Sequence, residues 1–231
     1  AFKKALDDKI TEVGLDVTVV ADNEVLDGEG QPQKVPHDKD PSVIYVHYPT
    51  LYTDNSSYTV PTIKIEISVL SMDEPFENRA LTSLIYDTFN EVDNATQCFV
   101  PTVLPIRTFL EKALLLNEEY QKKSPRSERM SRHLYDLERL MDTYSETAIN
   151  DSELYKSIIE HRKKFYHISS VDYDSDKREN IKIWPTGEIE NLFRDDYKAM
   201  IESFIYNENP LTFDQLRERI LLLEDKFREN T

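Results

Sequence analysis

The chain has 231 residues and a formal net charge of −16 at pH 7, and hydrophobic residues make up 39% of it. This apolar content is enough for a folded core, whereas the acidic excess argues against a general binder of nucleic acid or acidic membranes, which would show a basic surface. The single cysteine, Cys98, excludes an internal disulfide and a metal site built from paired cysteines. No apolar run is long enough to span a membrane, so we expect a cytoplasmic protein without a membrane partner.

The first third of the chain is predicted to be rich in β-structure after a short helical pattern. Partly alternating, β-branched segments predict strands, and a segment rich in Asp, Asn, Gly and Pro predicts a loop. The predicted strands cover residues 15–20, 42–48 and 63–70, and the predicted loop covers residues 21–40.

The strand over residues 63–70 shows the clearest two-residue alternation. Its isoleucines occupy one face, and Lys64, Glu66 and Ser68 occupy the other. A carboxylate on the polar face of a strand is a suitable oxygen ligand for Mg²⁺, although the same position also suits a residue that only faces solvent. Glu66 is therefore a candidate metal ligand.

Residues 71–106 connect the predicted strands to the predicted helices. Residues 73–78 are predicted to form a charged turn, residues 80–89 a strand or a short helix, and residues 99–106 an extended segment interrupted by prolines. From Pro105 onward the apolar spacing is close to 3.6 residues, which is typical of helices.

The remainder of the chain is predicted to be helical. Thr212 and Gln215 form the pattern of a capping box at the start of the last helix. An α+β fold follows, with a sheet domain over residues 1–106 and a helical domain over residues 107–231. The predicted helices cover residues 107–122, 127–144, 153–164, 189–205 and 212–227, with an irregular acidic segment at 168–185.

The helix predicted over residues 127–144 has a charged face and an apolar face. At about 100° per residue, the charged face would carry an imidazole and a carboxylate among arginines. A solvated face with ion pairs such as Arg132–Asp136 is the simpler interpretation. The residues on this face are Arg129, Arg132, His133, Asp136 and Arg139, and the apolar stripe opposite them contains Met130, Leu134, Leu137, Met141 and Tyr144.

The net charge reverses locally to +3 between Lys112 and His133. A positive segment inside a strongly acidic protein is what a site for an anionic ligand would show. The basic residues are Lys112, Lys122, Lys123, Arg126, Arg129 and Arg132, and the acidic ones are Glu118, Glu119 and Glu128.

Three stretches, in this order, resemble the nucleotidyltransferase AbiEii/AbiGii toxin family, whose members are toxins of type IV toxin–antitoxin systems. Val60-Pro-Thr-Ile-Lys-Ile-Glu-Ile-Ser68 is similar to the family's late catalytic-sheet strand, and the segment from Val100 to Lys112 is similar to the entry into its lysine-bearing helix. Arg129-Met-Ser-Arg-His-Leu-Tyr-Asp-Leu-Glu-Arg139 is similar to its Arg-x-x-Tyr-Asp-Leu motif. The resemblance continues weakly through residues 160–164 and 195–198.

The resemblance implies a partial nucleotidyltransferase-type mixed sheet followed by a helical C-terminal region. It also implies Mg²⁺-dependent transfer of a nucleotide from an NTP to an RNA acceptor, with tRNA the leading candidate, and a cognate antitoxin as a partner. Lys112 would neutralise phosphate charge, and Asp136 would position the lysine or the nucleotide. Arg129 and Arg132 would bind phosphate, and Glu66 would be the third carboxylate of the sheet.

One departure from the family concerns its metal-binding signature. The signature is a Gly-Gly/Ser turn followed about ten residues later by Asp-x-Asp on the first two strands, and we do not identify it here. Gly28-Glu-Gly30 departs from the turn, and Asp174-Ser-Asp176 comes far too late. Because the chain starts at Ala1 and not at Met, we expect the signature to lie upstream, and we expect the chain as it stands to be inactive.

Two other functions remain open. Arg126 and His133 are spaced loosely like the Arg-x(4–6)-His signature of metal-independent HEPN ribonucleases, in which such a pair cleaves RNA by acid–base chemistry. A non-enzymatic module that binds an antitoxin is the third possibility. RNA cleavage in the presence of EDTA would separate the ribonuclease from a metal-dependent transferase.

Overall fold

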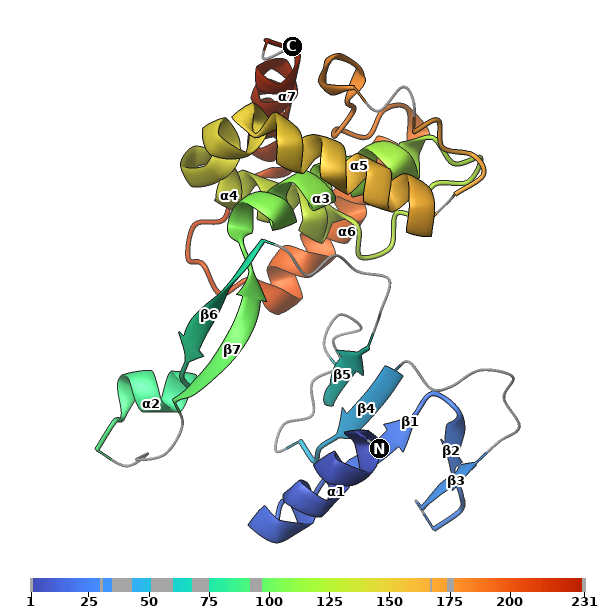
Figure 1. Cartoon of the computed structure of the whole chain (residues 1–231), viewed down its shortest axis with the longest axis vertical. Helices are drawn as coiled ribbons and strands as arrows, with labels where there is room; N and C mark the ends of the chain where they lie inside the picture. The colour runs from blue at the N-terminus through green and yellow to red at the C-terminus, as the bar shows by residue number, and fades with distance from the viewer. Residues whose placement is uncertain are drawn as a thin grey trace. The chain divides into compact units, whose positions relative to one another are not determined.

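The computed structural model describes residues 2–29, 31–34, 43–50, 60–67, 75–91, 97–166, 168–173 and 177–229. The chain divides into two compact units, residues 1–71 and residues 72–231. Helices and small sheets occur together, so the predicted α+β class is confirmed (Figure 1). The predicted domain boundary after residue 106 falls inside the second unit, and it stays a prediction about how functional domains divide.

The first unit is built around a three-stranded antiparallel sheet in the order β1-β4-β5 (Figure 1). The sheet consists of β1 (Thr18–Ala21), β4 (Val43–His47) and β5 (Thr62–Glu66), and helix α1 (Phe2–Val13) precedes it. The recorded pairings of β4 with β1 and with β5 are both antiparallel. Each strand predicted over 15–20, 42–48 and 63–70 therefore overlaps an observed strand with different ends, and residues 42 and 68–70 lie outside the described residues.

The core of the first unit is formed by alternating residues of the sheet, Val19, Ile44 and Val46. Leu6 and Ile10 pack against this core from α1. They are four residues apart and so lie on one face of the helix. The mixed helical pattern at the start of the chain is thus an amphipathic helix that covers the sheet.

The long loop predicted over residues 21–40 contains a second hairpin, so that prediction is wrong in part. Strands β2 (Glu24–Leu26) and β3 (Pro32–Lys34) pair antiparallel. The carboxylate of Asp27 accepts hydrogen bonds from the backbone N–H of Glu29 and Gln31. An aspartate that binds the backbone in this way closes a turn, which explains how a loop-like composition still supports two short strands.

The second unit begins with a hairpin of β6 (Phe76–Leu81) and β7 (Cys98–Val103). The charged turn predicted over 73–78 is wrong for residues 76–78, which lie in β6. Residues 73 and 74 lie outside the described residues. The segment predicted as strand or short helix contains both, because α2 (Leu84–Thr88) begins after the strand, where Ser83 Oγ accepts a hydrogen bond from Tyr86 N.

Five longer helices form the body of the second unit, and the five predicted helices are confirmed. Helix α3 begins with Pro105 in its first turn, a position that needs no backbone N–H. Thr212 and Gln215 form the predicted capping box, since Thr212 N donates to Gln215 Oε1 and Gln215 N donates to Thr212 Oγ1. The helices are α3 (Pro105–Tyr120), α4 (Ser131–Asn150), α5 (Ser152–Phe165), α6 (Glu188–Phe204) and α7 (Phe213–Glu229), with a short 3-10 helix at Arg178–Asn180.

The helices pack through apolar faces. The predicted stripe is buried at Met130, Leu134, Leu137 and Met141 but only half-buried at Tyr144. The rings of Phe109 and Phe227 stack between α3 and α7, with their centres 6.0 Å apart. Each fully buried large apolar side chain stabilises the fold by about 1.5–3 kcal/mol. The fully buried residues include Leu110 and Leu114 of α3, Leu134 and Leu137 of α4, Ile158 of α5, Phe193 of α6 and Ile220 and Leu223 of α7.

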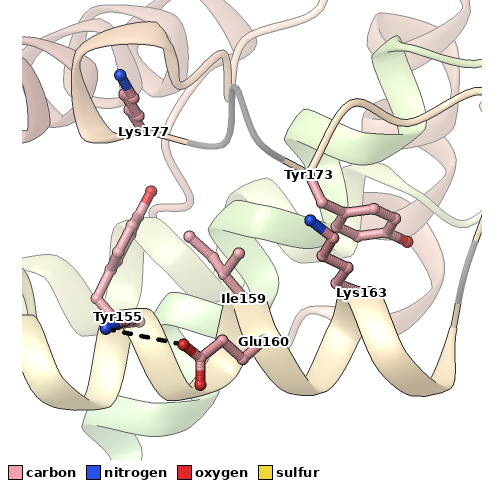
Figure 2. Close-up of a pocket in the computed structure, with 7 residues that line it drawn as sticks. Tyr155, Ile159, Glu160, Lys163, Tyr173 and Lys177 are labelled. Atoms are coloured by element: carbon pink, nitrogen blue, oxygen red, sulfur yellow. Dashed lines mark ion pairs between the residues drawn. The ribbon is translucent and has the colours of Figure 1, made fainter.

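A hollow of about 490 Å³ lies between α5 and the segment that follows it. Figure 2 shows Tyr155 and Ile159 pointing from α5 towards the segment that carries Tyr173 and Lys177. Lys156 and Glu160, one turn apart on α5, form an ion pair of 3.8 Å at its edge. The hollow is a mixed aromatic and charged surface of the second unit.

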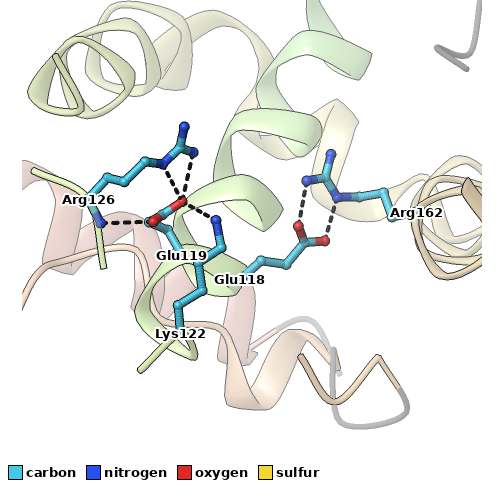
Figure 3. Close-up of polar contacts among 5 residues, drawn as sticks. All are labelled: Glu118, Glu119, Lys122, Arg126 and Arg162. Atoms are coloured by element: carbon cyan, nitrogen blue, oxygen red, sulfur yellow. Dashed lines mark hydrogen bonds and ion pairs between the residues drawn. The ribbon is translucent and has the colours of Figure 1, made fainter. Parts of the chain in front are cut away.

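A buried ion pair joins α3 to α5. The guanidinium of Arg162 donates to both carboxylate oxygens of Glu118, with N–O distances of 2.5 and 2.6 Å (Figure 3). The side chains are 8% and 2% exposed. Two parallel hydrogen bonds fix both direction and distance, so the pair locks the two helices in one register.

Among the described helices, none is both long and apolar enough to cross a membrane.

We predict that Arg162→Met lowers the free energy of unfolding by about 3–5 kcal/mol, because it leaves the Glu118 carboxylate buried without a counter-charge. Chemical denaturation measures the change. The double variant Glu118→Leu/Arg162→Met should recover most of the loss, since no lone charge remains. A single variant as stable as the wild type would contradict the structural role of the pair.

Candidate functional site

The candidate site is centred on an ion pair between α3 and α4. Lys112 Nζ lies 2.6 Å from Asp136 Oδ2, and the two side chains are 22% and 41% exposed. The two residues are 24 positions apart, so the packing of the helices brings them together. The simpler interpretation of the α4 face paired Asp136 with Arg132, whereas the structure pairs it with Lys112.

The first turn of α4 is held by a carboxylate from another helix. Asp196 of α6 accepts hydrogen bonds from Arg129 N at 2.7 Å and from Ser131 N at 2.9 Å, and Ser131 Oγ also donates to it. A carboxylate at a helix N-terminus satisfies unpaired N–H groups and interacts favourably with the helix dipole. Asp196 therefore fixes where α4 begins and how its first turn is oriented.

The predicted start of this helix is corrected by the same contact. The prediction placed residues 127–130 in the helix, but α4 begins at Ser131, and Arg129 has a positive φ of 57°. Arg129 is therefore not part of the charged face of α4, contrary to the prediction. Arg132 and Arg139 do remain on that face and are exposed.

His133 lies on α4 one turn before Asp136. Its Nδ1 atom is buried and makes no hydrogen bond within the described part of the chain. The pKa of His133 is lowered to about 4, chiefly by burial and then by the positive charges of Lys112 and Arg132, which outweigh the carboxylate of Asp136. The ring is therefore neutral near pH 7.

Part of the predicted positive charge is used in structural ion pairs. Glu119 accepts hydrogen bonds from Arg126 and from Lys122 (Figure 3). Burial alone would raise the pKa of Glu119, but these donors outweigh it and lower the pKa to about 2. Residues 112–133 therefore do not form a single anion site as a whole. Arg126, one residue of the HEPN-like pair, is bound by the carboxylate of Glu119.

Glu66 lies in the first unit, at the end of β5. Its side chain is 67% exposed and forms an ion pair of 2.7 Å with Lys64. Lys64 and Glu66 thus lie on the same face of β5, as predicted. Within the described ranges, no group of three or more His, Cys, Asp or Glu side chains is arranged to hold a metal ion.

The sequence does contain an Asp-x-Asp element, so the prediction that it is missing is wrong. Asp38-Lys39-Asp40 begins eight residues after Gly30. These aspartates fall in the gap between residues 34 and 43, outside the described residues. The Gly-Gly/Ser turn remains absent from this position, because Gly28 and Gly30 are separated by Glu29.

Two features of the site were not predicted. The orphan nitrogen of His133 depends on which atoms pack against the ring, and Asp196 is more than 60 residues from the helix it caps. The only sequence signal for Asp196 was the weak resemblance over residues 195–198. The hollow beside Tyr155, outside this site, was also not predicted.

The comparisons with known proteins give one match. A family model described as nucleotidyl transferase AbiEii toxin, type IV TA system, matches residues 1–219. No curated protein and no solved structure matches the chain.

We predict that stability falls with acidification in a way that depends on His133. The unfolded pKa is near 6.5 and the folded pKa is about 4, so between these values the unfolded state binds a proton that the folded state excludes. The free energy of unfolding should therefore decrease as pH falls through this window, by an amount on the order of 2–3 kcal/mol. Denaturation at several pH values measures it.

His133→Gln should remove this part of the pH dependence, because glutamine does not titrate. His47→Gln, in the first unit, controls for the loss of a histidine. Parallel stability curves for the wild type and His133→Gln between pH 4 and 6.5 would contradict the assignment.

Proposed function

Because the chain belongs to the AbiEii nucleotidyl transferase toxin family of type IV toxin–antitoxin systems, we propose that it serves in transferring a nucleotide from an NTP to an RNA acceptor. tRNA is the leading acceptor, and such an acceptor would place the reaction in the cytoplasm. The toxin family implies a cognate antitoxin as a partner. The proposal concerns the substrate and the residues, which the family match leaves open.

The contact between Lys112 and Asp136 is the observation that carries the proposal. An ammonium group is a compact charge that binds phosphate well and can leave one anionic partner for another. Asp136 holds this group at a defined position, with its Oδ2 atom 2.6 Å from Lys112 Nζ. On binding, the triphosphate would take over Lys112, which would then neutralise the charge that develops during transfer.

Arg132 supplies the second cation of the proposed site. It lies on the exposed side of α4, one turn before Asp136. Its guanidinium can bind two phosphate oxygens at once, which would orient the triphosphate relative to Lys112. Arg129 contributes differently, because its backbone N–H is bound to Asp196 and it lies before the helix. We propose that Arg129 binds phosphate from this loop position.

Mg²⁺ is the metal expected for this family, and the described residues alone do not form a site for it. Glu66 is exposed and paired with Lys64, and no cluster of ligands surrounds it within the described segments. We therefore derive no step through a metal from these residues. Asp38, Asp40 and Glu66 are the carboxylates to test as its ligands.

We predict that Lys112→Ala and Asp136→Ala each lower nucleotide incorporation into tRNA by at least about a hundredfold, because each removes a charge that acts directly on the phosphates or on their lysine. The assay follows labelled nucleotides from each NTP into tRNA with Mg²⁺. Lys123→Ala is the matched control, since Lys123 is an exposed lysine of the same basic segment. Wild-type rates in both site variants would contradict the proposed roles.

Asp38-Lys39-Asp40 is the candidate for the family's Asp-x-Asp element, so the 231-residue chain is assayed beside the double variant Asp38→Asn/Asp40→Asn. Loss of transfer in the double variant would assign the metal site to these aspartates, and wild-type transfer in it would exclude them. RNA cleavage in EDTA would instead support the ribonuclease hypothesis.

A further inference from the structure

His133 is a polar side chain beside the proposed phosphate site that is not used by the fold. Its Nδ1 atom is buried without a hydrogen bond, and no contact between its ring and the Asp136 carboxylate is recorded in the described part of the chain. The ring nevertheless senses the charges of Lys112 and Asp136. A buried polar atom without a partner costs free energy, so its retention here calls for an explanation.

The burial of Nδ1 indicates which of the two ring nitrogens of His133 carries the hydrogen. Unpaired buried N–H groups are rarer in proteins than under-satisfied acceptors. A neutral ring therefore keeps a bare lone pair at Nδ1 and carries its hydrogen on Nε2. The ring of His133 is only partly buried as a whole, so Nε2 is the nitrogen that remains for a ligand.

The position of the ring suits an anionic ligand. His133 and Asp136 are three residues apart on α4, so their side chains are neighbours on its surface. Lys112 reaches the same place from α3. A neutral N–H donor adds a hydrogen bond to a phosphate oxygen without repelling Lys112 or Arg132, which a third cation would do.

We propose that His133 is a phosphate-binding residue, whose Nε2–H donates to an oxygen of the NTP triphosphate held by Lys112. This inference rests on the proposed function. Neither the family match nor the sequence resemblance assigns a role to this histidine. The ligand chemistry is a phosphate oxygen. The triphosphate is favoured over the RNA backbone because the proposed function assigns Lys112, the ion-pair partner of Asp136, to the triphosphate.

Three substitutions at this position separate the two ring nitrogens. The side-chain amide of glutamine reaches approximately the place of Nε2, whereas that of asparagine ends near Nδ1. His133→Gln therefore keeps the proposed donor, and His133→Asn and His133→Ala remove it. Thermal unfolding of each variant establishes that it is folded before binding is measured.

The test is calorimetric titration of the 231-residue chain with inorganic tripolyphosphate, without metal. The dissociation constant should rise by at least about tenfold in His133→Asn and His133→Ala, as expected for a hydrogen bond to a charged group, and should stay within about threefold in His133→Gln. His161→Asn, a histidine of α5, is the matched control. Unchanged affinity in His133→Ala would overturn the inference, as would no binding by the wild type at millimolar tripolyphosphate.

Two further measurements complete the test. Long-range ¹⁵N spectra of the imidazole should show the Nε2–H tautomer near pH 7 and a shift on adding tripolyphosphate, and the Nδ1–H tautomer would overturn the inference. A short RNA oligonucleotide is the second ligand, and dependence on His133 for RNA alone would also overturn it. The proposed function is judged separately: loss of tripolyphosphate binding in Lys112→Ala with full binding in His133→Ala would leave it standing.

Discussion

The packing of α3 against α4 is the constraint on which the candidate site depends. Leu110 and Leu114 of α3 and Leu134 and Leu137 of α4 are fully buried, so neither helix can rotate about its axis without exposing apolar surface. With this packing fixed, Lys112 and Asp136 meet at the edge of the buried faces. The apolar core thereby positions two charged groups that belong to different helices.

Buried carboxylates stabilise the helical body of the second unit. Glu118 is paired with Arg162, and Glu119 is paired with Arg126 and Lys122. Glu224 of α7 accepts the backbone N–H groups of Ile183 and Trp184. Buried charges are tolerated only with such partners, so these acidic residues act in the fold and not as a repulsive surface.

Local patterns were predictable, and contacts between distant residues were not. The stripe of α4 and the capping box at Thr212 depend on neighbours in the sequence, and both are confirmed. The start of α4 depends on Asp196, so periodicity placed it four residues early. Helical spacing favoured Arg132 as the partner of Asp136, and only the family resemblance singled out Lys112. Neither signal could reveal the unpaired nitrogen of His133, which depends on three-dimensional packing.

Two of the ion pairs of α3, Glu118–Arg162 and Lys112–Asp136, differ in how much they contribute to stability. The Glu118–Arg162 pair is nearly inaccessible to solvent, so removing one partner alone leaves a buried charge and destabilises the fold. The Lys112–Asp136 pair is partly exposed, and pairs of this kind contribute about 0–1 kcal/mol. Because so little stability depends on it, stability does not explain a lysine and an aspartate matched at 2.6 Å across two helices. The proposed exchange of the carboxylate for an anion would account for it, and removing either residue should impair that exchange while leaving the fold intact.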